Sequence, residues 1–526
     1  MMLKRVPIVV VVGVVAALAA AKTSRADVRP NPLFADHMVL QRGDVTPVWG
    51  TAAPGERVTV TFAGQTRETT AGADGAWRIE LRDLVAGGPH TLSMAGTNVV
   101  TLSDVFVGDV WLCAGQSNME WALARCTGGE EAVDRSPEQR FVRLCTIPHA
   151  CADEPQSEVA ARWSLPDPKV TRFFSGVAWW FATKLQREID VPVGVINCSY
   201  GGTTIQAWMP GDVLARGPWP KDASTDVSLS RADYDKRRAA LQPVMDRYLA
   251  EKAEAVRNGR SPPPHPAGWP GDFRGPTRLW NGMIAPLAPL RIRGVAWYQG
   301  ESNAYVRVAD TYGDLLPAMI ASWRDGFGSP ELPFLVFQIS RCRARKADPN
   351  APSGMAQLRE AQDRTVRSTP RTALVVTLDL GVEDVHYPDK EPAGERAAKA
   401  ALALAYGRDV AASGPRYQGL ECGAGRAVVR FDRAIGGLES RGGPLQGFAI
   451  AGSDRRFFVA DASIAGDTVV VTSPNVPEPV AVRYGWADMP DVNLFDGTGL
   501  PAAPFRSDDW PLAAGGAAAG TGPSAP

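Results

Sequence analysis

The strongest indication of how this chain folds is Val105-Phe-Val-Gly-Asp-Val-Trp-Leu-Cys-Ala-Gly-Gln-Ser-Asn-Met-Glu120. Its apolar run is typical of a strand buried on both faces, and the glycine turn that follows ends that strand. Ser117 therefore stands at the carboxyl end of a sheet strand, just before a helix whose first N–H groups can stabilise an anion. The same serine would also serve as an ordinary helix N-cap, so this stretch alone does not define a catalytic site.

Further apolar runs follow this strand and alternate with segments of helical period. The expected strands are Gly194–Ser199, Gly294–Tyr298, Phe334–Ile339 and Ala373–Leu378, and the expected helices include Val177–Glu188, Tyr312–Trp323 and Ala393–Tyr406. Apolar strands that alternate with helices predict an α/β fold with a parallel sheet covered on both faces.

The sequence changes character on either side of this α/β region, and 526 residues are enough for two or three domains. Short alternating runs between glycine-rich turns predict a small β-sandwich before it. A polar, proline-rich interruption with one expected helix, Arg231–Arg257, has the character of an insertion. The expected division is 1–26 signal peptide, 27–103 N-terminal β domain, 104–410 α/β domain with an insertion at about 211–277, 411–510 C-terminal β region and 511–526 disordered tail.

The first residues predict export. A basic start precedes an apolar run from Pro7 to Ala21, and Ser24-Arg-Ala26 supplies small residues for cleavage after Ala26. The run is shorter than the roughly 20 residues that cross a bilayer, so we expect a periplasmic or secreted protein without membrane attachment after cleavage. The formal net charge is -1 and the basic residues are spread along the chain, which argues against a nucleic-acid partner.

The seven cysteines are an odd number, so at least one thiol has no partner within the chain. Cys113 and Cys198 lie in apolar strand-like runs and are expected to be buried thiols. Cys126, Cys145 and Cys151 have spacings that allow pairing with one another in an oxidising compartment. No CxxC pair or His/Cys/Asp cluster has the spacing of a metal site, and we expect neither a metal nor a cofactor.

One of the five histidines stands where a functional side chain is expected. His386 follows the expected strand Ala373–Leu378, and functional side chains of parallel sheets gather at the carboxyl ends of strands. Asp384 lies two residues before it, and a carboxylate beside a histidine can fix its tautomer and stabilise its protonated form. The other histidines, which lie in the N-terminal β region, a polar loop and the insertion, are His37, His90, His149 and His265.

Two further strand ends carry polar residues. Ser199 has the surroundings of a nucleophile elbow, but an asparagine stands two positions before it, where an elbow needs a small residue. We therefore interpret Ser199 as structural, and Gly201 and Gly202 as a loop that brings a backbone N–H to an oxyanion. At the next strand end, Gln299 offers an amide donor and Glu301 an acid.

Four motifs lie at these strand ends: Gly115-Gln-Ser-Asn-Met-Glu-Trp121, Gly201-Gly-Thr-Thr204 with Ala207-Trp208, Trp297-Tyr-Gln-Gly-Glu-Ser-Asn-Ala304 and Asp384-Val-His386. Other motifs are Leu33–Arg42, Pro47-Val-Trp-Gly50, Asn281–Pro286, Leu358–Gln362, Val482-Arg-Tyr-Gly-Trp486 and Phe505–Trp510. Together and in this order they resemble the sialate O-acetylesterase family of the SGNH-hydrolase superfamily. The resemblance covers nearly all of the chain after the signal peptide, except the insertion and the tail.

The resemblance implies an SGNH-type three-layer α/β/α domain and a serine esterase that removes O-acetyl groups from carbohydrates. It makes Ser117 the nucleophile and His386 the base. It also implies an oxyanion hole formed by the Ser117 N–H, a glycine N–H at Gly201 or Gly202, and the side chain of Gln299.

The acid that orients His386 stays open at this point. Asp384 matches the acid that precedes the histidine, and Glu301 lies in a motif from which it can reach the same ring. Glu383 stands where other SGNH enzymes carry their aspartate and is placed third. Tyr387 follows the histidine where the family usually has proline, which leaves the conformation of this loop, and the place of its acid, undecided.

The expected substrate is an acetylated carbohydrate. Besides acetylated sialic acids, acetylated xylan or pectin oligosaccharides fit an exported esterase of this type. A non-catalytic carbohydrate-binding protein on a degenerate hydrolase scaffold is the alternative from another class, and the presence of both Ser117 and His386 argues against it. The sequence carries no prediction of oligomeric state.

Overall fold

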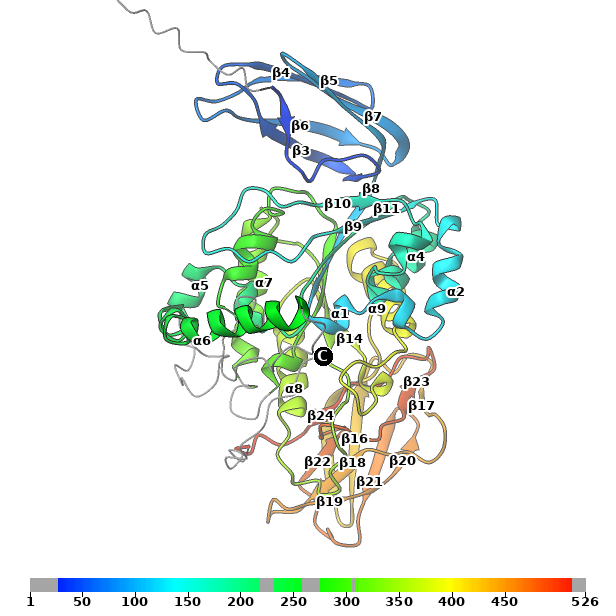
Figure 1. The fold of residues 1–526 in the computed structure, drawn as a ribbon. Coiled ribbons are helices and arrows are strands. Elements are labelled where there is room, and N and C mark those ends of the chain that lie inside the picture. The colour runs from blue at the N-terminus through cyan, green and yellow to red at the C-terminus, as the bar shows by residue number, and fades with distance from the viewer. Residues whose placement is uncertain (1–26, 218–230, 258–274, 305–308, 310, 513–526) are drawn as a thin grey trace, which may run out of the picture.

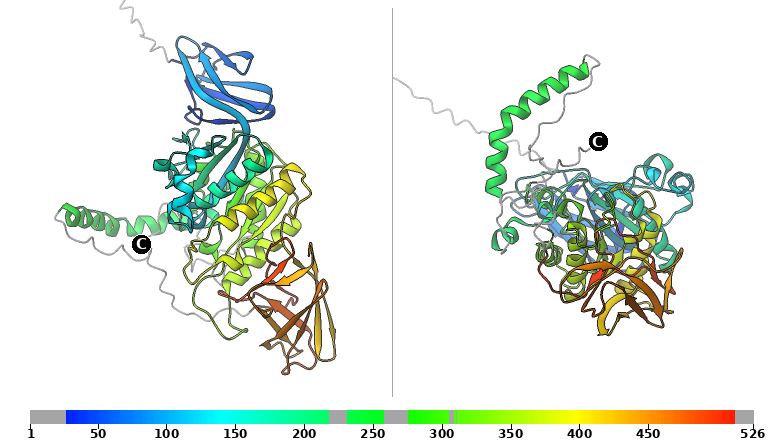
Figure 2. Two further views of the ribbon diagram at one scale, coloured as in Figure 1. Left: turned by 90° about the vertical axis from the view of Figure 1, so that its right-hand side faces the viewer. Right: turned by 90° about the horizontal axis from the view of Figure 1, so that it is seen from below.

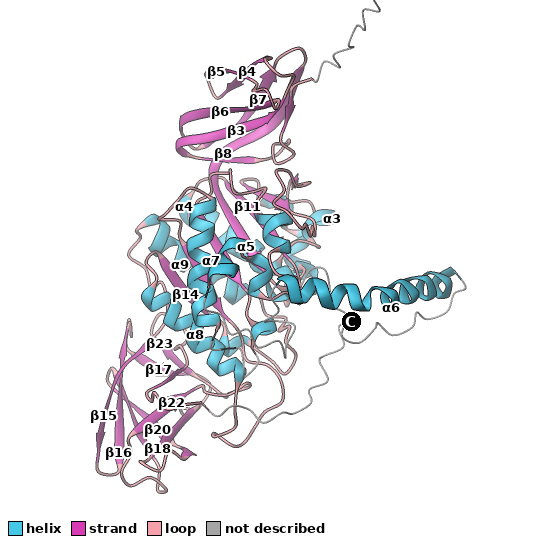
Figure 3. Cartoon of the chain, turned by 90° about the vertical axis from the view of Figure 1, so that its left-hand side faces the viewer, coloured by secondary structure: helices cyan, strands magenta, loops and turns pink. Residues whose placement is uncertain are grey.

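A computed structural model describes residues 27–217, 231–257, 275–304, 309 and 311–512 of the chain. Three parts follow one another along the molecule: an N-terminal part of strands, a middle part of strands and helices, and a C-terminal part of strands (Figures 1 and 3). The α/β fold that the apolar runs predict is confirmed for the middle part.

The middle part is built on one sheet with the strand order β10-β9-β11-β8-β12-β13-β14. Neighbours from β9 to β14 run parallel, and only the pairing of β10 with β9 is antiparallel along this path. The bounds are β8 Val99–Gly115, β9 Val142–Thr146, β10 Arg162–Ser164, β11 Val193–Ser199, β12 Gly294–Tyr298, β13 Phe334–Gln338 and β14 Thr372–Val376. The expected strands overlap β8, β11, β12, β13 and β14, whereas β9 and β10 were not predicted.

The register of the central strands decides where the site forms. Gly115 at the end of β8 pairs with Ser199 of β11 on one side and with Tyr298 of β12 on the other. Since these strands are parallel and end at one level, the segments that follow them emerge together at one edge of the sheet.

Helices flank this sheet on both sides (Figure 1). Helices α4 (Gly176–Ile189) and α9 (Glu391–Tyr406) pack on one another beside the sheet, and α7 (Tyr312–Gly326) and α8 (Gly354–Ser368) do so on the other side. Small residues allow the α4–α9 contact: a Cβ atom at Gly394 would lie 2.8 Å from the backbone N of Phe181. The shorter helices are α1 Ser117–Glu120, α2 Gly129–Asp134, α3 Pro168–Thr171 and α5 Gly211–Arg216.

Strand β8 belongs to two parts of the molecule. Its first half pairs with β2 and β7 of the N-terminal part, and its second half is the centre of the middle sheet. The boundary expected at 103/104 therefore lies inside a continuous strand. Where the two parts meet, Arg42 donates two hydrogen bonds of 2.9 Å to the buried carboxylate of Asp109. The other N-terminal strands are β1 Arg29–Pro30, β2 Val39–Gln41, β3 Gly43–Thr51, β4 Arg57–Phe62, β5 Gln65–Thr70, β6 Ala76–Leu84 and β7 Gly87–Ala95.

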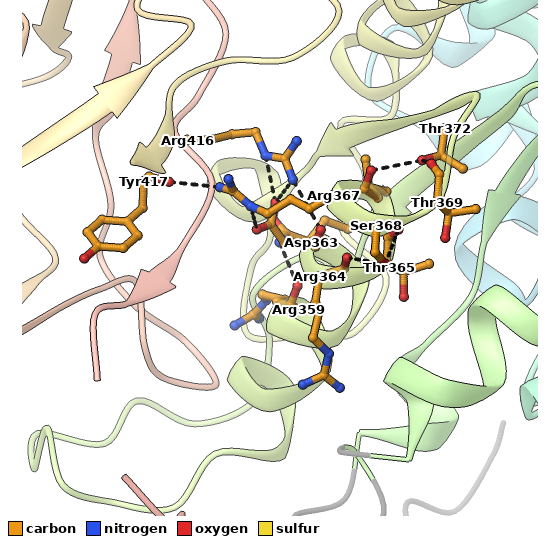
Figure 4. Close-up of polar contacts among 12 residues, drawn as sticks. Arg359, Asp363, Arg364, Thr365, Arg367, Ser368, Thr369, Thr372, Arg416 and Tyr417 are labelled. Carbon is orange, nitrogen blue, oxygen red and sulfur yellow. Dashed lines mark hydrogen bonds and ion pairs between the residues drawn. The ribbon is translucent and has the colours of Figure 1, made fainter. Parts of the chain in front are cut away.

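The C-terminal part docks on helix α8. Arg416 at the start of β15 reaches the Asp363 carboxylate on α8, and Arg367 of that helix donates to the backbone oxygen of Tyr417 (Figure 4). The strands of this part are β15 Arg416–Gly423, β16 Arg426–Asp432, β17 Leu438–Ser440, β18 Phe448–Ala451, β19 Phe457–Val459, β20 Asp461–Ala465, β21 Thr468–Thr472, β22 Ala481–Tyr484, β23 Leu494–Asp496 and β24 Phe505–Arg506.

The expected insertion projects from the middle part. Its helix α6 spans Arg231–Arg257, the bounds that the sequence predicts, and extends away from the body of the molecule (Figure 2). No helix within the described residues is long and apolar enough to cross a membrane. The signal peptide expected at 1–26 and most of the tail, 513–526, lie outside the described residues.

None of the seven cysteines forms a disulfide within the described residues. Cys113 and Cys198 are buried, as expected from their apolar strands. The pairing considered for Cys126, Cys145 and Cys151 is not formed, and Cys145 lies inside the central sheet as a residue of β9.

Candidate active site

The turn after β8 is fixed by its neighbour β12. Gly115 has a φ of 141°, and a Cβ atom there would lie 2.0 Å from the backbone oxygen of Tyr298, so only glycine fits. Gln116 donates its backbone N–H to the same oxygen at 2.9 Å. Its side-chain oxygen accepts the backbone N–H of Gly300 at 3.2 Å, which ties the turn to the loop after β12. Ser117 therefore leaves the sheet in one defined direction.

Ser117 is the first residue of α1 and is half-buried. Its N–H is one of the first amides of a helix, which have no acceptor within the helix itself. Among the described residues the Ser117 hydroxyl makes no hydrogen bond. A serine that only capped the helix would accept an N–H from the first turn, and here no side chain caps the helix.

The loop that carries His386 packs against the segment that begins at Ser117. The imidazole ring stacks on Trp121, with ring centroids 4.7 Å apart and an interplanar angle of 19°. Asn118 donates its side-chain N–H to the backbone oxygen of Val385 at 3.0 Å. The structure thus brings the predicted nucleophile and the predicted base into one site. No hydrogen bond joins the two groups among the described residues, and such catalytic contacts are often long before substrate binds.

Asp384 is the carboxylate beside the His386 ring. Its Oδ1 lies 3.6 Å from Nδ1 of the ring and accepts the backbone N–H of His386 at 2.7 Å. Burial lowers the pKa of His386, and the negative charge of Asp384 partly offsets that shift. The Asp384 side chain is 69% exposed, so its contact with the ring is open to water.

Glu301 lies elsewhere in the site. One of its carboxylate oxygens accepts the side-chain N–H of Asn118 at 2.6 Å, and the other is buried without a hydrogen-bond partner. Burial raises the pKa of this carboxyl. No contact joins Glu301 to the His386 ring within the described residues, whereas Asp384 lies beside that ring.

Gly201 adjoins the nucleophile. A Cβ atom at Gly201 would lie 3.3 Å from Cβ of Ser117, so the glycine leaves room beside the serine. The Gly201 N–H donates to the Glu120 carboxylate at 2.6 Å. A negatively charged oxygen therefore already occupies this donor, which shows that the loop can hold an anion there. Gly202 follows with a φ of 72°, in the left-handed region that glycine favours.

Gln299 is buried below this site, with its amide donating to three protein acceptors. These are Oε1 of Gln116 at 3.1 Å, the backbone oxygen of Thr203 at 3.0 Å and Oδ1 of Asn303 at 2.8 Å. In this arrangement the amide fastens the loops after β8, β11 and β12 to one another rather than facing the Ser117 hydroxyl.

Two further contacts in the site were not predicted. His149 lies 2.8 Å from the Glu120 carboxylate and stacks on Tyr200, with ring centroids 3.6 Å apart. Lys390 is fully buried below the His386 loop, and burial lowers its pKa to about 7. His149 lies in a loop without periodicity, and Lys390 stands among charged residues before α9, so neither carries a local sequence signal.

Comparison with known proteins identifies the family of the chain. Residues 107–221 and 274–403 match the model of a family described as carbohydrate esterase, sialic acid-specific acetylesterase. The segment between the two matched ranges contains helix α6 and lies within the predicted insertion.

A solved structure of a carbohydrate acetylesterase from Xanthomonas citri superposes with a TM-score of 0.78 at 35% identity, covering 92% of this chain and 100% of that one. Sialate O-acetylesterase from Homo sapiens is 28% identical over 437 residues, which are 75% of this chain and 74% of the human protein. The protein of the same name from Mus musculus is 26% identical over 506 residues, with 86% and 88% covered.

A parallel α/β sheet with a serine at the end of its central strand and a histidine beside it is an arrangement that serine esterases use. The chain belongs to the sialic acid-specific acetylesterase family of carbohydrate esterases. As a member it is a carboxylic ester hydrolase that removes O-acetyl groups from carbohydrates.

Proposed function

We propose that the protein cleaves carbohydrate O-acetyl esters through a Ser117–His386–Asp384 triad and an acetyl-enzyme. The observation that supports this most is the packing of the His386 ring on Trp121, four residues after the serine, at a centroid distance of 4.7 Å. Asp384 lies on the Nδ1 side of the ring, which leaves Nε2 for the serine. We also propose that the middle part is an SGNH-type three-layer domain.

The first half of the reaction transfers the acetyl group to the enzyme. His386 Nε2 takes the proton of the Ser117 hydroxyl while Oγ attacks the carbonyl carbon of the ester. The bond between that carbon and the sugar oxygen then breaks. The proton held on Nε2 passes to the departing sugar oxygen, which leaves as a hydroxyl group, and Ser117 carries the acetyl ester.

The second half restores the serine. A water molecule gives a proton to His386 and attacks the acetyl carbon. The bond from that carbon to Oγ breaks, the proton returns to Oγ, and acetate leaves. Asp384 stabilises the protonated imidazole in both halves by its negative charge beside Nδ1.

The oxyanion of each tetrahedral intermediate needs donors beside Ser117. The Ser117 N–H at the start of α1 and the N–H of Gly201 fit this role, with Gly202 as the alternative glycine. Gly201 already donates to a carboxylate oxygen of Glu120, and substrate would have to take over that donor. In our proposal Gln299 contributes by fastening the loops that carry these donors.

The triad is tested by substitution of the nucleophile. Ser117→Ala should reduce the turnover of 4-nitrophenyl acetate to background and abolish labelling by a fluorophosphonate, with an unchanged thermal midpoint. Ser199→Ala is the matched control, because that buried hydroxyl donates to Oδ1 of Asn197 at 2.6 Å and has no catalytic role in this mechanism. Full turnover by Ser117→Ala would refute the assignment.

The substrate class is inferred from the relatives. The human and mouse proteins are named sialate O-acetylesterase, so we propose O-acetylated sialic acids as the first substrates. Acetylated xylan and pectin oligosaccharides are the alternatives. Release of acetate from equal concentrations of these three classes, compared by kcat/KM, tests this: a higher value for a xylan or pectin fragment overturns the sialic acid assignment.

We propose export of the enzyme on the basis of residues 1–26. A basic start, a short apolar run and Ser24-Arg-Ala26 have the order of a cleavable signal peptide. Expression of the full chain in a bacterial host should place the protein in the periplasm or medium with Asp27 as its first residue. Recovery of the uncleaved chain from the cytosol would contradict this.

A further inference from the structure

Asn118 lies at the centre of the site and is fully buried. It directly follows the proposed nucleophile, and its side-chain N–H holds the backbone oxygen of Val385, the residue before His386, at 3.0 Å. One amide thus connects the segment of the nucleophile to the segment of the base. The two segments come from β8 and from the loop after β14, far apart in the sequence, so contacts such as this one hold Ser117 and His386 in one site.

Two buried charged residues bind the same amide on opposite sides. The oxygen of Asn118 accepts a hydrogen bond from Lys390 Nζ, and its nitrogen donates to Glu301 at 2.6 Å. Lys390 and Asn118 are fully buried, and Glu301 is 8% exposed. Within the described residues, Lys390 Nζ has no other hydrogen-bond acceptor and Glu301 accepts from no other side chain.

These two contacts allow only one orientation of the amide. The Lys390 amino group donates to the carbonyl oxygen of the amide, and the Glu301 carboxyl accepts from its NH2 group. A flipped amide would place the NH2 group against Lys390 and the oxygen against Glu301, and it would also lose the donor to Val385. Each of the two buried groups would then lose its hydrogen-bond partner on Asn118, which is costly for groups removed from solvent.

We propose that Asn118 is a positioning residue that sets the approach of His386 to Ser117, and that Lys390 and Glu301 fix its orientation. This role rests on the proposed triad and gives Glu301 a function other than the triad acid. Lys390 Nζ also lies over the ring of Tyr387, 3.4 Å from its centroid. Lys390 and Glu301 touch no reacting atom, and in this proposal they act through Asn118. The two buried groups therefore serve to hold the geometry of the catalytic pair.

A mutant cycle tests this mode of action. Asn118→Ala should lower kcat on 4-nitrophenyl acetate by on the order of 10²-fold, because a small misplacement of a catalytic pair costs about that much. KM should change by less than about threefold, since Asn118 does not contact substrate. The rate of fluorophosphonate labelling of Ser117 should fall together with kcat.

The second arm of the cycle substitutes Lys390. Lys390→Met should lower kcat by about tenfold in the wild-type background and by less than about twofold in the Asn118→Ala background, because residues that act as a unit are non-additive. Lys390→Met leaves Glu301 buried without a counter-charge. If this single variant fails to fold, the double variant Lys390→Met/Glu301→Gln is used instead, because it leaves neither of the two charges buried alone.

A matched control separates positioning from general stability. Arg143 of β9 and Asp104 in the first half of β8 form a partly buried ion pair at 3.1 Å, with side chains 5% and 28% exposed, at the end of the sheet away from the site. Arg143→Met/Asp104→Asn should lower the thermal midpoint without lowering kcat of the folded enzyme.

The possible results distinguish the positioning role of Asn118 from the proposed triad itself. The positioning role is supported by a loss in kcat that depends on Asn118. It is overturned if Asn118→Ala keeps the wild-type kcat, if the loss appears in KM alone, or if Lys390→Met costs the same in both backgrounds. Wild-type enzyme that is neither labelled at Ser117 nor able to turn over the ester would instead refute the proposed triad.

Discussion

In the proposed triad His386 acts as a base only while its ring is neutral, and its surroundings favour the neutral form. Burial lowers its pKa, and the ordinary histidine value is about 6.5. The acid limb of the pH profile of kcat/KM should therefore lie below about pH 6.5, because the ring of His386 is protonated only at a pH lower than that of an ordinary histidine. A profile whose acid limb lies above pH 7 would contradict it.

Replacement of each candidate acid separates their roles. Asp384→Asn removes the charge that raises the pKa of His386, so the acid limb should move to lower pH while kcat falls by on the order of 10²-fold. Glu301→Gln should leave the acid limb in place, because Asn118 holds that carboxylate away from the ring. Both pH profiles are measured with 4-nitrophenyl acetate between about pH 4 and pH 9, a range that brackets the ordinary pKa of histidine. A shifted limb in Glu301→Gln alone would make Glu301 the triad acid.

Strands β8 and β12 approach so closely at the site that one glycine is essential. Gly115→Ala would place a methyl group 2.0 Å from the Tyr298 backbone oxygen, at a φ that other residues rarely adopt. Backbone atoms on a central strand cannot move aside, so the free energy of unfolding should fall by about 2–4 kcal/mol, and turnover should be lost. Urea unfolding and activity measure the two effects.

The matched control lies on the edge of the C-terminal part. Gly423 at the end of β15 has no heavy atom within 4 Å of the position of an added Cβ atom. Gly423→Ala should change stability by no more than about 0.5 kcal/mol. An equal loss in both variants would mean that the close approach at Gly115 has no special cost.

The sequence predicts those elements whose pattern is determined locally. The apolar runs of β11 and β12 coincide with strands within a residue, because a strand buried on both faces needs an unbroken apolar run. Strand β9 contains Arg143 among apolar residues and was missed, since the arginine interrupts the apolar run and its charge partner, Asp104, lies far away in the sequence. The double role of β8 was also missed, because strand pairing across two parts of the molecule leaves no local pattern.

The site divides in the same way. Ser117, His386 and Gly201 were predicted as site residues because they follow strands and lie in the family motifs. The network around Asn118 depends on which way side chains point inside the folded molecule. The sequence placed Glu301 near the site but did not reveal its partner, because the choice between His386 and Asn118 depends on the direction of one side chain.

The C-terminal part also contacts residues that hold the loop carrying His386. Arg341, which follows β13, donates to the backbone oxygen of Gly381 at 2.9 Å and to that of Pro490 at 2.9 Å. Gly381 lies on the chain that leads to His386, and Pro490 belongs to the C-terminal part. The position of His386 is therefore linked to the docking of the C-terminal strands, and weaker docking should disturb that position.

Asp363 and Arg416 form the ion pair that most directly fastens this docking (Figure 4). Their side chains are 15% and 7% exposed, so removal of one partner leaves a largely buried charge. Asp363→Asn should therefore destabilise the protein by about 3 kcal/mol, and the double variant Asp363→Asn/Arg416→Met should be less destabilised than the sum of the single changes. The exposed pair Arg430–Glu421 on the same sheet is the control, and its loss should cost less than about 1 kcal/mol. Thermal unfolding followed together with esterase activity measures both effects. If docking positions His386, activity in Asp363→Asn is lost at a lower temperature than the middle part unfolds; if the two losses coincide in every variant, the C-terminal part contributes only stability.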